Sequence, residues 1–124
     1  MSSKGEMVPS AGLPSQLERE SFPGLDLRPE DVRTVTAILE RYAPGVEVRV
    51  FGSRVGAQAK RYSDLDLMLC GSEPLPTRTL SLLAQAFADS DLPIKVDIID
   101  GATTAPAWRE RVLAHSVVIR PAAA

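Results

Sequence analysis

The sequence predicts one small α/β domain in which helices pack on a β-sheet. Apolar residues recur with helical spacing in some segments and at every second position in others, and these segments alternate along the chain. The chain has 124 residues, of which 44% are hydrophobic and 24% charged, as in an ordinary globular protein with one core. Because few residues are left between the segments, we expect a single layered α/β sandwich.

The first part of the chain differs from the rest. Residues 1–24 are rich in Ser, Gly and Pro and have no apolar periodicity beyond a short helical turn around residues 16–20, so we expect a flexible leader. The folded domain is therefore placed at residues 25–124. No segment has the pattern of a signal peptide or of a membrane span, which favours a cytoplasmic protein.

The first helix and strand follow this leader. Pro29 suits the first position of a helix, and Glu30 and Asp31 come next, near the positive end of the helix dipole. Apolar residues then follow at helical spacing, at Val32, Val35, Ile38, Leu39 and Tyr42. Pro-Gly at 44–45 ends the helix. Residues 46–51 alternate valines with other residues, which indicates a strand with one face in the core.

The middle of the chain contains a short helix, a strand and a longer helix. Residues 54–60 favour a helix, weakened only by Gly56. Residues 63–70 alternate as a strand whose leucines share one face. After a turn, residues 77–89 have helical spacing. The side chains expected to face inward from this helix are Leu80, Leu83, Ala84 and Phe87.

The last part of the chain completes the pattern. Pro93 precedes a third strand at residues 94–100, which alternates in the same way. A helix is expected at residues 106–114 and an edge strand at residues 116–120. The element order is thus α-β-α-β-α-β-α-β.

Three aspartates lie within apolar strands. Asp64 and Asp66 are one residue apart, so on a strand they point to the same side, roughly 7 Å from each other. Asp97 lies in the third strand. Like charges this close repel unless a cation lies between them, and Mg²⁺ prefers oxygen ligands together with substrate phosphates. Three such carboxylates suit a metal site for phosphoryl transfer.

A glycine–serine pair ends the first strand. Gly52 lets the backbone approach a ligand closely, and the following N–H groups and the Ser53 hydroxyl can hold phosphate oxygens. Arg54 can add positive charge. Asp64 follows Ser53 by eleven positions. The turn and the carboxylates together indicate a phosphoryl-transfer site more specifically than either feature alone.

The stretches GSRVGAQAKRYSDLDL and KVDIID resemble the signature of the nucleotidyltransferase superfamily that includes DNA polymerase β. That signature is a Gly-Ser turn, a spacer, Asp-x-Asp and an acidic residue on a later strand. More closely, residues 28–120 are similar to the minimal nucleotidyltransferases, the MNT proteins that pair with HEPN toxins in toxin–antitoxin systems. The resemblance implies the polymerase β-like nucleotidyltransferase fold, with a mixed β-sheet and helices packed on it.

The same resemblance implies roles for particular residues. The nucleotide-binding residues would be Gly52, Ser53, Arg54 and Ser63. The catalytic and Mg²⁺-binding residues would be Asp64, Asp66 and Asp97. The last of these would lie near the attacking hydroxyl, as a base. This chain departs from the family at Ala57, where relatives often carry a glycine, and has Gly56 instead.

The activity implied is Mg²⁺-dependent transfer of AMP from ATP to a protein hydroxyl, a tyrosine of a HEPN toxin, by a type VII-like antitoxin. One alternative is a non-catalytic antitoxin that neutralises the HEPN partner by binding. Another is a small-molecule nucleotidyltransferase of the antibiotic-modifying type, for which a homodimer could build the acceptor pocket. The net charge of −2 argues against direct binding of nucleic acid.

Simpler interpretations of these residues stay open. Asp64 and Asp66 could lie at a solvent-exposed strand end, and Asp97 on an edge strand. Ser53 could serve only as a turn residue. Asp100 is the less favoured ligand, because it falls at the end of its strand.

Overall fold

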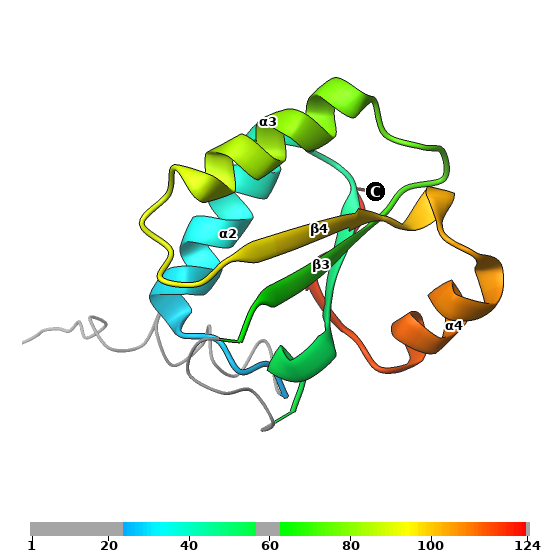
Figure 1. The fold of residues 1–124 in the computed structure, drawn as a ribbon, viewed down its shortest axis with the longest axis horizontal. Helices are drawn as coiled ribbons and strands as arrows, with labels where there is room; N and C mark the ends of the chain where they lie inside the picture. The colour runs from blue at the N-terminus through cyan, green and yellow to red at the C-terminus, as the bar shows by residue number, and fades with distance from the viewer. Residues whose placement is uncertain (1–23, 57–62, 124) are drawn as a thin grey trace, which may run out of the picture.

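In the computed structural model, which describes residues 24–56 and 63–123, helices lie on both faces of one β-sheet (Figure 1). The described elements are α2 (Pro29–Tyr42), β2 (Glu47–Phe51), η1 (Gly52–Arg54), β3 (Leu65–Cys70), α3 (Thr77–Ala88), β4 (Val96–Asp100), η2 (Gly101–Thr103), α4 (Pro106–Ala114) and β5 (Val117–Arg120). The two η elements are single 3₁₀ turns at strand ends.

The described strands form one sheet of four, in the order β4-β3-β2-β5. Strand β2 runs antiparallel to β3 and to β5, whereas β3 and β4 run parallel. The sheet is therefore mixed, as expected, and β5 is an edge strand, as the sequence predicted. Strand β4 forms the other edge.

One face of the sheet forms the core. Val50 of β2 and Leu67 of β3 are opposite each other in the register and are fully buried, and Val35 of α2 and Leu83 of α3 belong to the same cluster. The apolar stripes of α2 and α3 thus both pack on this face, because helical spacing puts their large side chains on one side of each helix.

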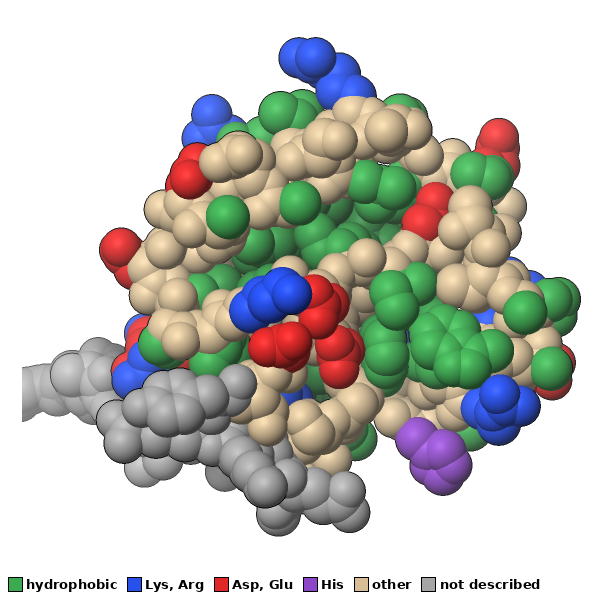
Figure 2. All heavy atoms as spheres, in the orientation of Figure 1, with side chains coloured by type: hydrophobic (Ala, Val, Ile, Leu, Met, Phe, Trp, Pro, Cys, Tyr) green, Lys and Arg blue, Asp and Glu red, His purple; other side chains and the backbone are tan. Residues whose placement is uncertain are grey.

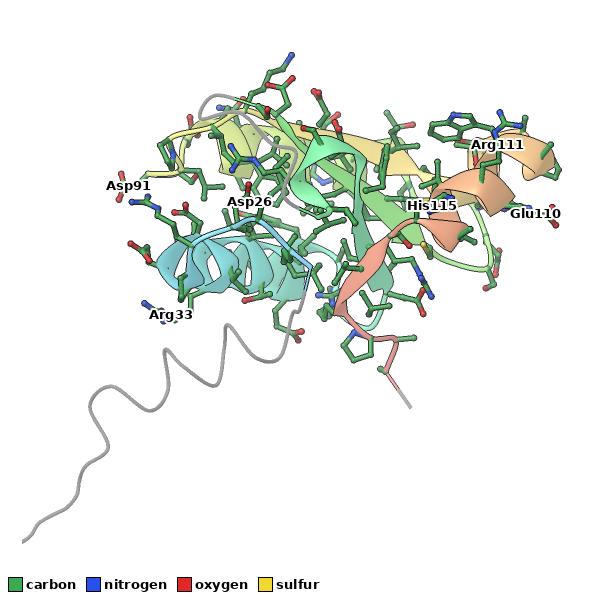
Figure 3. All side chains as sticks on the ribbon, turned by 90° about the horizontal axis from the view of Figure 1, so that it is seen from below. Asp26, Arg33, Asp91, Glu110, Arg111 and His115 are labelled. Carbon is green, nitrogen blue, oxygen red and sulfur yellow. The ribbon has the colours of Figure 1, made fainter. Side chains whose placement is uncertain are left out.

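The opposite face of the sheet is only partly covered. Side chains alternate along a strand, so the residues between the buried leucines point to this face. Only α4 lies over it among the described helices, and none of the α4 residues is buried. Figure 3 shows Glu110 and Arg111 of α4 at the opposite end of the molecule from Arg33 of α2 and from Asp91. The side of this face away from α4 is therefore open.

Two expectations about local structure are wrong. The helix expected at residues 54–60 does not begin there: Arg54 belongs to the 3₁₀ turn η1, and Val55 is extended and forms a β-bridge with Leu25. Its remaining residues, 57–60, lie outside the described part. Ala84 was expected to face inward but is exposed, because no described element covers that side of α3.

The other boundaries agree with the sequence to within about two residues, since the periodicity that predicts them is local. The expected leader, apart from Gly24, lies outside the described residues. Within the described ranges, none of the helices is long and apolar enough to span a membrane.

Candidate active site

Asp66 is at the centre of the candidate site. In the sheet it is opposite Phe51 of β2 and beside Asp97 of β4, so three neighbouring strands meet around it. Its side chain points to the partly covered face, away from the buried neighbours Leu65 and Leu67. The strand order thus brings together carboxylates that are far apart in the sequence.

The next residue after β2, Gly52, leaves room for this carboxylate. Its backbone has a φ of +80°, which L side chains rarely adopt. A Cβ atom at this position would overlap the Oδ2 atom of Asp66. Two features therefore require glycine at this position: the positive φ of the turn and the Asp66 side chain beside it.

Asp66 lies in an electrostatic environment that disfavours its charged form. Burial, followed by the negative charges of Asp97 and Asp64, raises the pKa of Asp66 above its ordinary value of 3.8. Lys95 forms an ion pair with Asp97 at 3.6 Å. Figure 2 shows the acidic side chains gathered near the middle of the face, with a basic side chain beside them. Such a cluster favours the binding of a cation.

The described residues do not form a finished metal site. No three His, Cys, Asp or Glu side chains within residues 24–56 and 63–123 are arranged as they stand to hold a metal ion. Carboxylate oxygens are nevertheless the donors that Mg²⁺ prefers, and small side-chain rotations change their spacing. Binding of Mg²⁺ by Asp64, Asp66 and Asp97 therefore stays a prediction.

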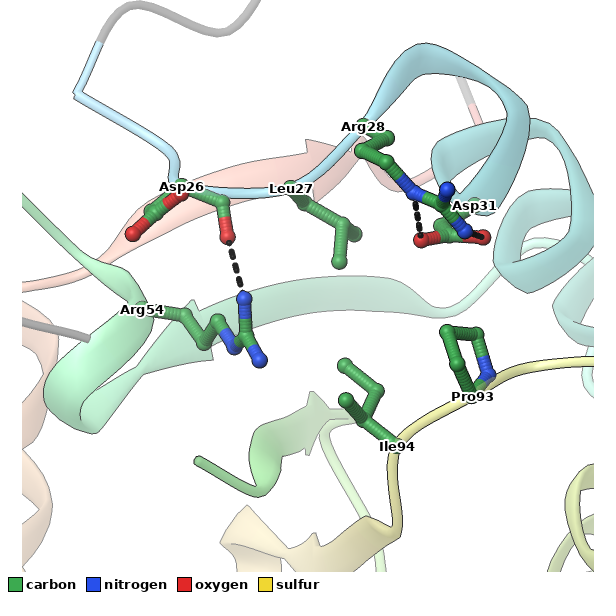
Figure 4. A pocket seen from close by; sticks show the side chains of 7 residues that line it. All are labelled: Asp26, Leu27, Arg28, Asp31, Arg54, Pro93 and Ile94. Carbon is green, nitrogen blue, oxygen red and sulfur yellow. Dashed lines mark hydrogen bonds and ion pairs between the residues drawn. The ribbon is translucent and has the colours of Figure 1, made fainter. Parts of the chain in front are cut away.

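The guanidinium of Arg54 is directed at main-chain carbonyls. It donates from Nη2 to the Ser63 oxygen at 2.9 Å and from Nη1 to the Asp26 oxygen at 3.2 Å. The Asp26 N–H in turn donates to the Arg54 carbonyl at 2.7 Å. Figure 4 shows the Arg54 side chain, only 8% exposed, between this segment and Ile94. Arg54 thus ties the start of the domain to the turn η1 and to the residues before β3.

Two aromatic side chains connect α4 to the site, and the sequence did not predict their contact. The ring of Trp108 meets that of Phe51 edge to face, with centroids 5.9 Å apart and planes at 90°. Phe51 is the residue before Gly52, so α4 packs directly beside the Gly-Ser turn. Alternation along residues 46–51 placed Phe51 on this face, but no local signal linked it to Trp108.

A family model described as polymerase beta, nucleotidyltransferase, matches residues 33–121. The chain therefore belongs to the polymerase β nucleotidyltransferase family, and its reaction class is nucleotidyl transfer. It is 44% identical over 100 residues to a Haemophilus influenzae protein described as a probable protein adenylyltransferase, MntA; the match covers 81% of this chain and 88% of that protein. The resemblance to the minimal nucleotidyltransferases is thereby confirmed.

Two solved structures share the fold. One, a toxin–antitoxin with AMP-PNP, has a TM-score of 0.63 at 22% identity and 73% coverage of each chain. The other, a tri-AMPylated Shewanella oneidensis HEPN toxin in complex with an MNT antitoxin, has a TM-score of 0.57 at 20% identity, with 74% of this chain and 71% of that chain covered. At these identities the likeness concerns the fold alone.

Proposed function

We propose that this nucleotidyltransferase moves AMP from ATP to a hydroxyl of a HEPN protein and so acts as its antitoxin. The observation that carries the proposal is the cluster of Asp66, Asp97 and Asp64 on the open face, directly beside the glycine turn. The MntA relative is described as a protein adenylyltransferase, and one structure with this fold contains an AMPylated HEPN toxin. Both support a protein as the acceptor.

The nucleotide would lie over the turn η1. The backbone at Gly52 has no side chain in the way of a phosphate, and the Ser53 hydroxyl and N–H groups can donate to phosphate oxygens. Ser63 lies two residues before β3, and its carbonyl accepts a hydrogen bond from Arg54. Arg54 matched the nucleotide-binding motif, but its guanidinium already donates to the carbonyls of Asp26 and Ser63. We therefore assign it the role of holding the turn in place.

The three aspartates would hold Mg²⁺ between the protein and the phosphates. Their oxygen donors favour a divalent cation, and so does the raised pKa of Asp66, which burial causes first and the negative charges of Asp97 and Asp64 add to. When bound, Mg²⁺ supplies positive charge that offsets the charge developing on the phosphate and leaving group.

The reaction balances as a single displacement at the α-phosphorus of ATP. The acceptor oxygen forms the new P–O bond, the bond to the oxygen bridging the β-phosphate breaks, and pyrophosphate leaves with that electron pair. The hydroxyl proton passes to a carboxylate, and we assign this role to Asp97. Asp97 lies on β4, the described strand furthest from the Gly-Ser turn that would hold the nucleotide. We further propose that the chain works in the cytoplasm, without direct contact to nucleic acid.

The test is label transfer from ATP labelled at the α-phosphate, with Mg²⁺ and a HEPN protein from the same organism. We expect label on a tyrosine of that protein, located by mass spectrometry. The Asp64→Asn/Asp66→Asn variant should lose the transfer, whereas Asp91→Asn, which changes an exposed carboxylate on the α3–β4 loop, should retain it.

The outcome that contradicts the proposal is also defined. If no label appears and wild type and double variant inhibit the HEPN protein equally, the chain neutralises its partner by contact alone. If label appears only when small hydroxylated antibiotics are added, the acceptor is a small molecule. If the three aspartates act through Mg²⁺, removing the ion with EDTA should abolish transfer to either acceptor.

A further inference from the structure

A groove lies along β4, an edge strand of the described sheet, between this strand and α3. Its volume is about 670 Å³. Leu80, Ala84 and Phe87 line it from α3, and Ile94 and Val96 line it from the other side. Figure 2 shows hydrophobic side chains at the surface in the hollow next to the acidic cluster. A groove of this size and lining is typical of a binding site for apolar side chains.

The groove is open for a structural reason. The order β4-β3-β2-β5 ends at β4, so this strand has a neighbour in the described sheet on one side only. Helix α3 buries Leu83 and Phe87 in the core but exposes Ala84, which the helical spacing had placed on the inward side. The apolar face of α3 therefore extends beyond the part that packs against the core. Exposed apolar surface of this kind commonly marks an interaction site.

The groove is continuous with the candidate active site. Lys95 and Asp97 also line it; Asp97 belongs to the acidic cluster on the open face, and Lys95 forms an ion pair with Asp97. Asp66 lies on β3, with the Gly-Ser turn after β2 on one side and β4 on the other. A nucleotide held at the turn reaches Asp66 from the β2 side. The acceptor hydroxyl must then approach from the opposite side, over β4.

We propose that the groove docks an apolar segment of the acceptor protein, next to the hydroxyl that receives AMP. This inference rests on the proposed function, because it names the surface that the acceptor uses. The lining is largely apolar, which suits leucine-like or aromatic side chains better than the polar edge of a nucleotide base. The segment's hydroxyl then lies at the rim, beside Asp97.

Ala84→Arg tests the proposal, because it places a long charged side chain in the groove from α3 and leaves every residue of the acidic cluster unchanged. Ala37→Arg is the matched control: Ala37 is also exposed and also lies within a helix, α2, and it does not line the groove. In the label-transfer assay with the HEPN protein, we expect Ala84→Arg to raise the KM for that protein at least tenfold. Affinity for a fluorescent ATP analogue should stay within twofold of wild type, as should every value for Ala37→Arg.

Each other outcome overturns the proposal. An unchanged KM in folded Ala84→Arg shows that the acceptor docks elsewhere. A loss of ATP affinity in the folded variant shows that the groove holds the nucleotide. A change only in oligomeric state, measured by sedimentation, shows that a second copy occupies it.

Two further controls separate the causes of failure. If Ala84→Arg does not fold, Ser81→Arg, at another exposed position lining the groove, replaces it in the same assay. If wild type itself transfers no label, the proposed function fails. If wild type transfers label and the folded groove variant, Ala84→Arg or its replacement Ser81→Arg, transfers it with unchanged KM, the docking inference alone fails.

Discussion

At Gly52 the backbone leaves β2 with a φ of +80° and passes directly beside the Asp66 carboxylate. Gly56 has a similar φ of +85°, but an added Cβ there meets no atom of the described residues within 4 Å. The two glycines therefore share a backbone requirement and differ in what lies beside them. Comparing the two positions therefore distinguishes the effect of a glycine on stability from its effect on the candidate site.

We expect Gly52→Ala and Gly56→Ala to lose similar stability, about 1–2 kcal/mol each, because both force an alanine into the left-handed region. Only Gly52→Ala should also push the Asp66 carboxylate aside, and transfer should then fall about 100-fold, as for other small misplacements of catalytic groups. Urea unfolding and label transfer measure the two effects. Equal loss of transfer in both variants would contradict this assignment.

Asp66 itself is expected to destabilise the fold. Its pKa is raised in the folded protein, so the folded state holds the proton more tightly than the unfolded state does. The charged form therefore costs stability at neutral pH, and the cost disappears as the pH falls through the raised pKa. Active-site groups often oppose stability in this way.

Asp66→Asn should accordingly raise the melting temperature at pH 7 without metal by about 2–4 °C, equivalent to roughly 0.5 kcal/mol, while abolishing transfer. The gain should shrink as the pH is lowered towards the ordinary carboxyl range, since wild-type Asp66 then takes up a proton. Calorimetry at several pH values in EDTA measures this. A gain that is the same at every pH would show that charge is not its cause.

The sequence alone was enough to identify candidate site residues, but it predicted less well how they are arranged in space. Motif spacing selected Gly52, Asp66 and Asp97, and the structure places all three together. The contact between Phe51 and Trp108 was not predicted, because those residues are far apart in the sequence and only tertiary packing joins them. The same holds for Arg54, whose carbonyl partners are at positions 26 and 63.

At the scale of single elements, β4 ends in a carboxylate with a structural task. Asp100 is 6% exposed and accepts hydrogen bonds from the N–H of Leu75 at 2.8 Å and of Ala102 at 3.1 Å. It thereby caps the turn η2 and holds the loop that leads into α3. Asp97, three residues earlier, faces the open side of the sheet instead.

The two aspartates of β4 should therefore respond oppositely to substitution. Asp100→Ala leaves two N–H groups without their acceptor and should cost about 1–3 kcal/mol of stability, with transfer retained at low temperature. Asp97→Asn should abolish transfer and change the free energy of unfolding by less than about 1 kcal/mol. Paired urea melts and transfer assays compare them. Loss of transfer in folded Asp100→Ala would place that residue in the site.

Helices were predictable where their apolar periodicity is local, as in α2 and α3. The failures have a common cause. Val55 does not continue a helix, because it pairs with Leu25 from a distant part of the chain. Ala84 has the right spacing to be buried, but spacing cannot reveal that the sheet ends at β4.

At the scale of the whole molecule, the contacts described for the domain begin at its first residues. Leu25 bridges to Val55, the Asp26 N–H donates to Arg54, and Arg54 donates back to the Asp26 carbonyl. We therefore propose that the segment 24–28 is part of the folding unit, near the boundary expected from composition. The segment before α2 then belongs to the domain rather than to a leader.

Two truncated chains test this boundary. A chain that begins at residue 24 should unfold like the full chain and keep its transfer activity. A chain that begins at residue 28 loses the contacts of Leu25 and Asp26, and the buried Arg54 loses an acceptor, which should cost about 2–3 kcal/mol or roughly 10–20 °C in melting temperature. Equal melting temperatures for the two truncated chains would move the boundary beyond residue 27.

The edge-to-face contact at α4 also has an optical consequence. Trp108 is the only tryptophan of the chain, and its ring touches the residue that directly precedes the phosphate turn. Indole emission responds to the charge and motion of its surroundings. Native fluorescence should therefore follow the arrival of a nucleotide in real time, with no dye attached, and Trp108→Phe provides the silent reference.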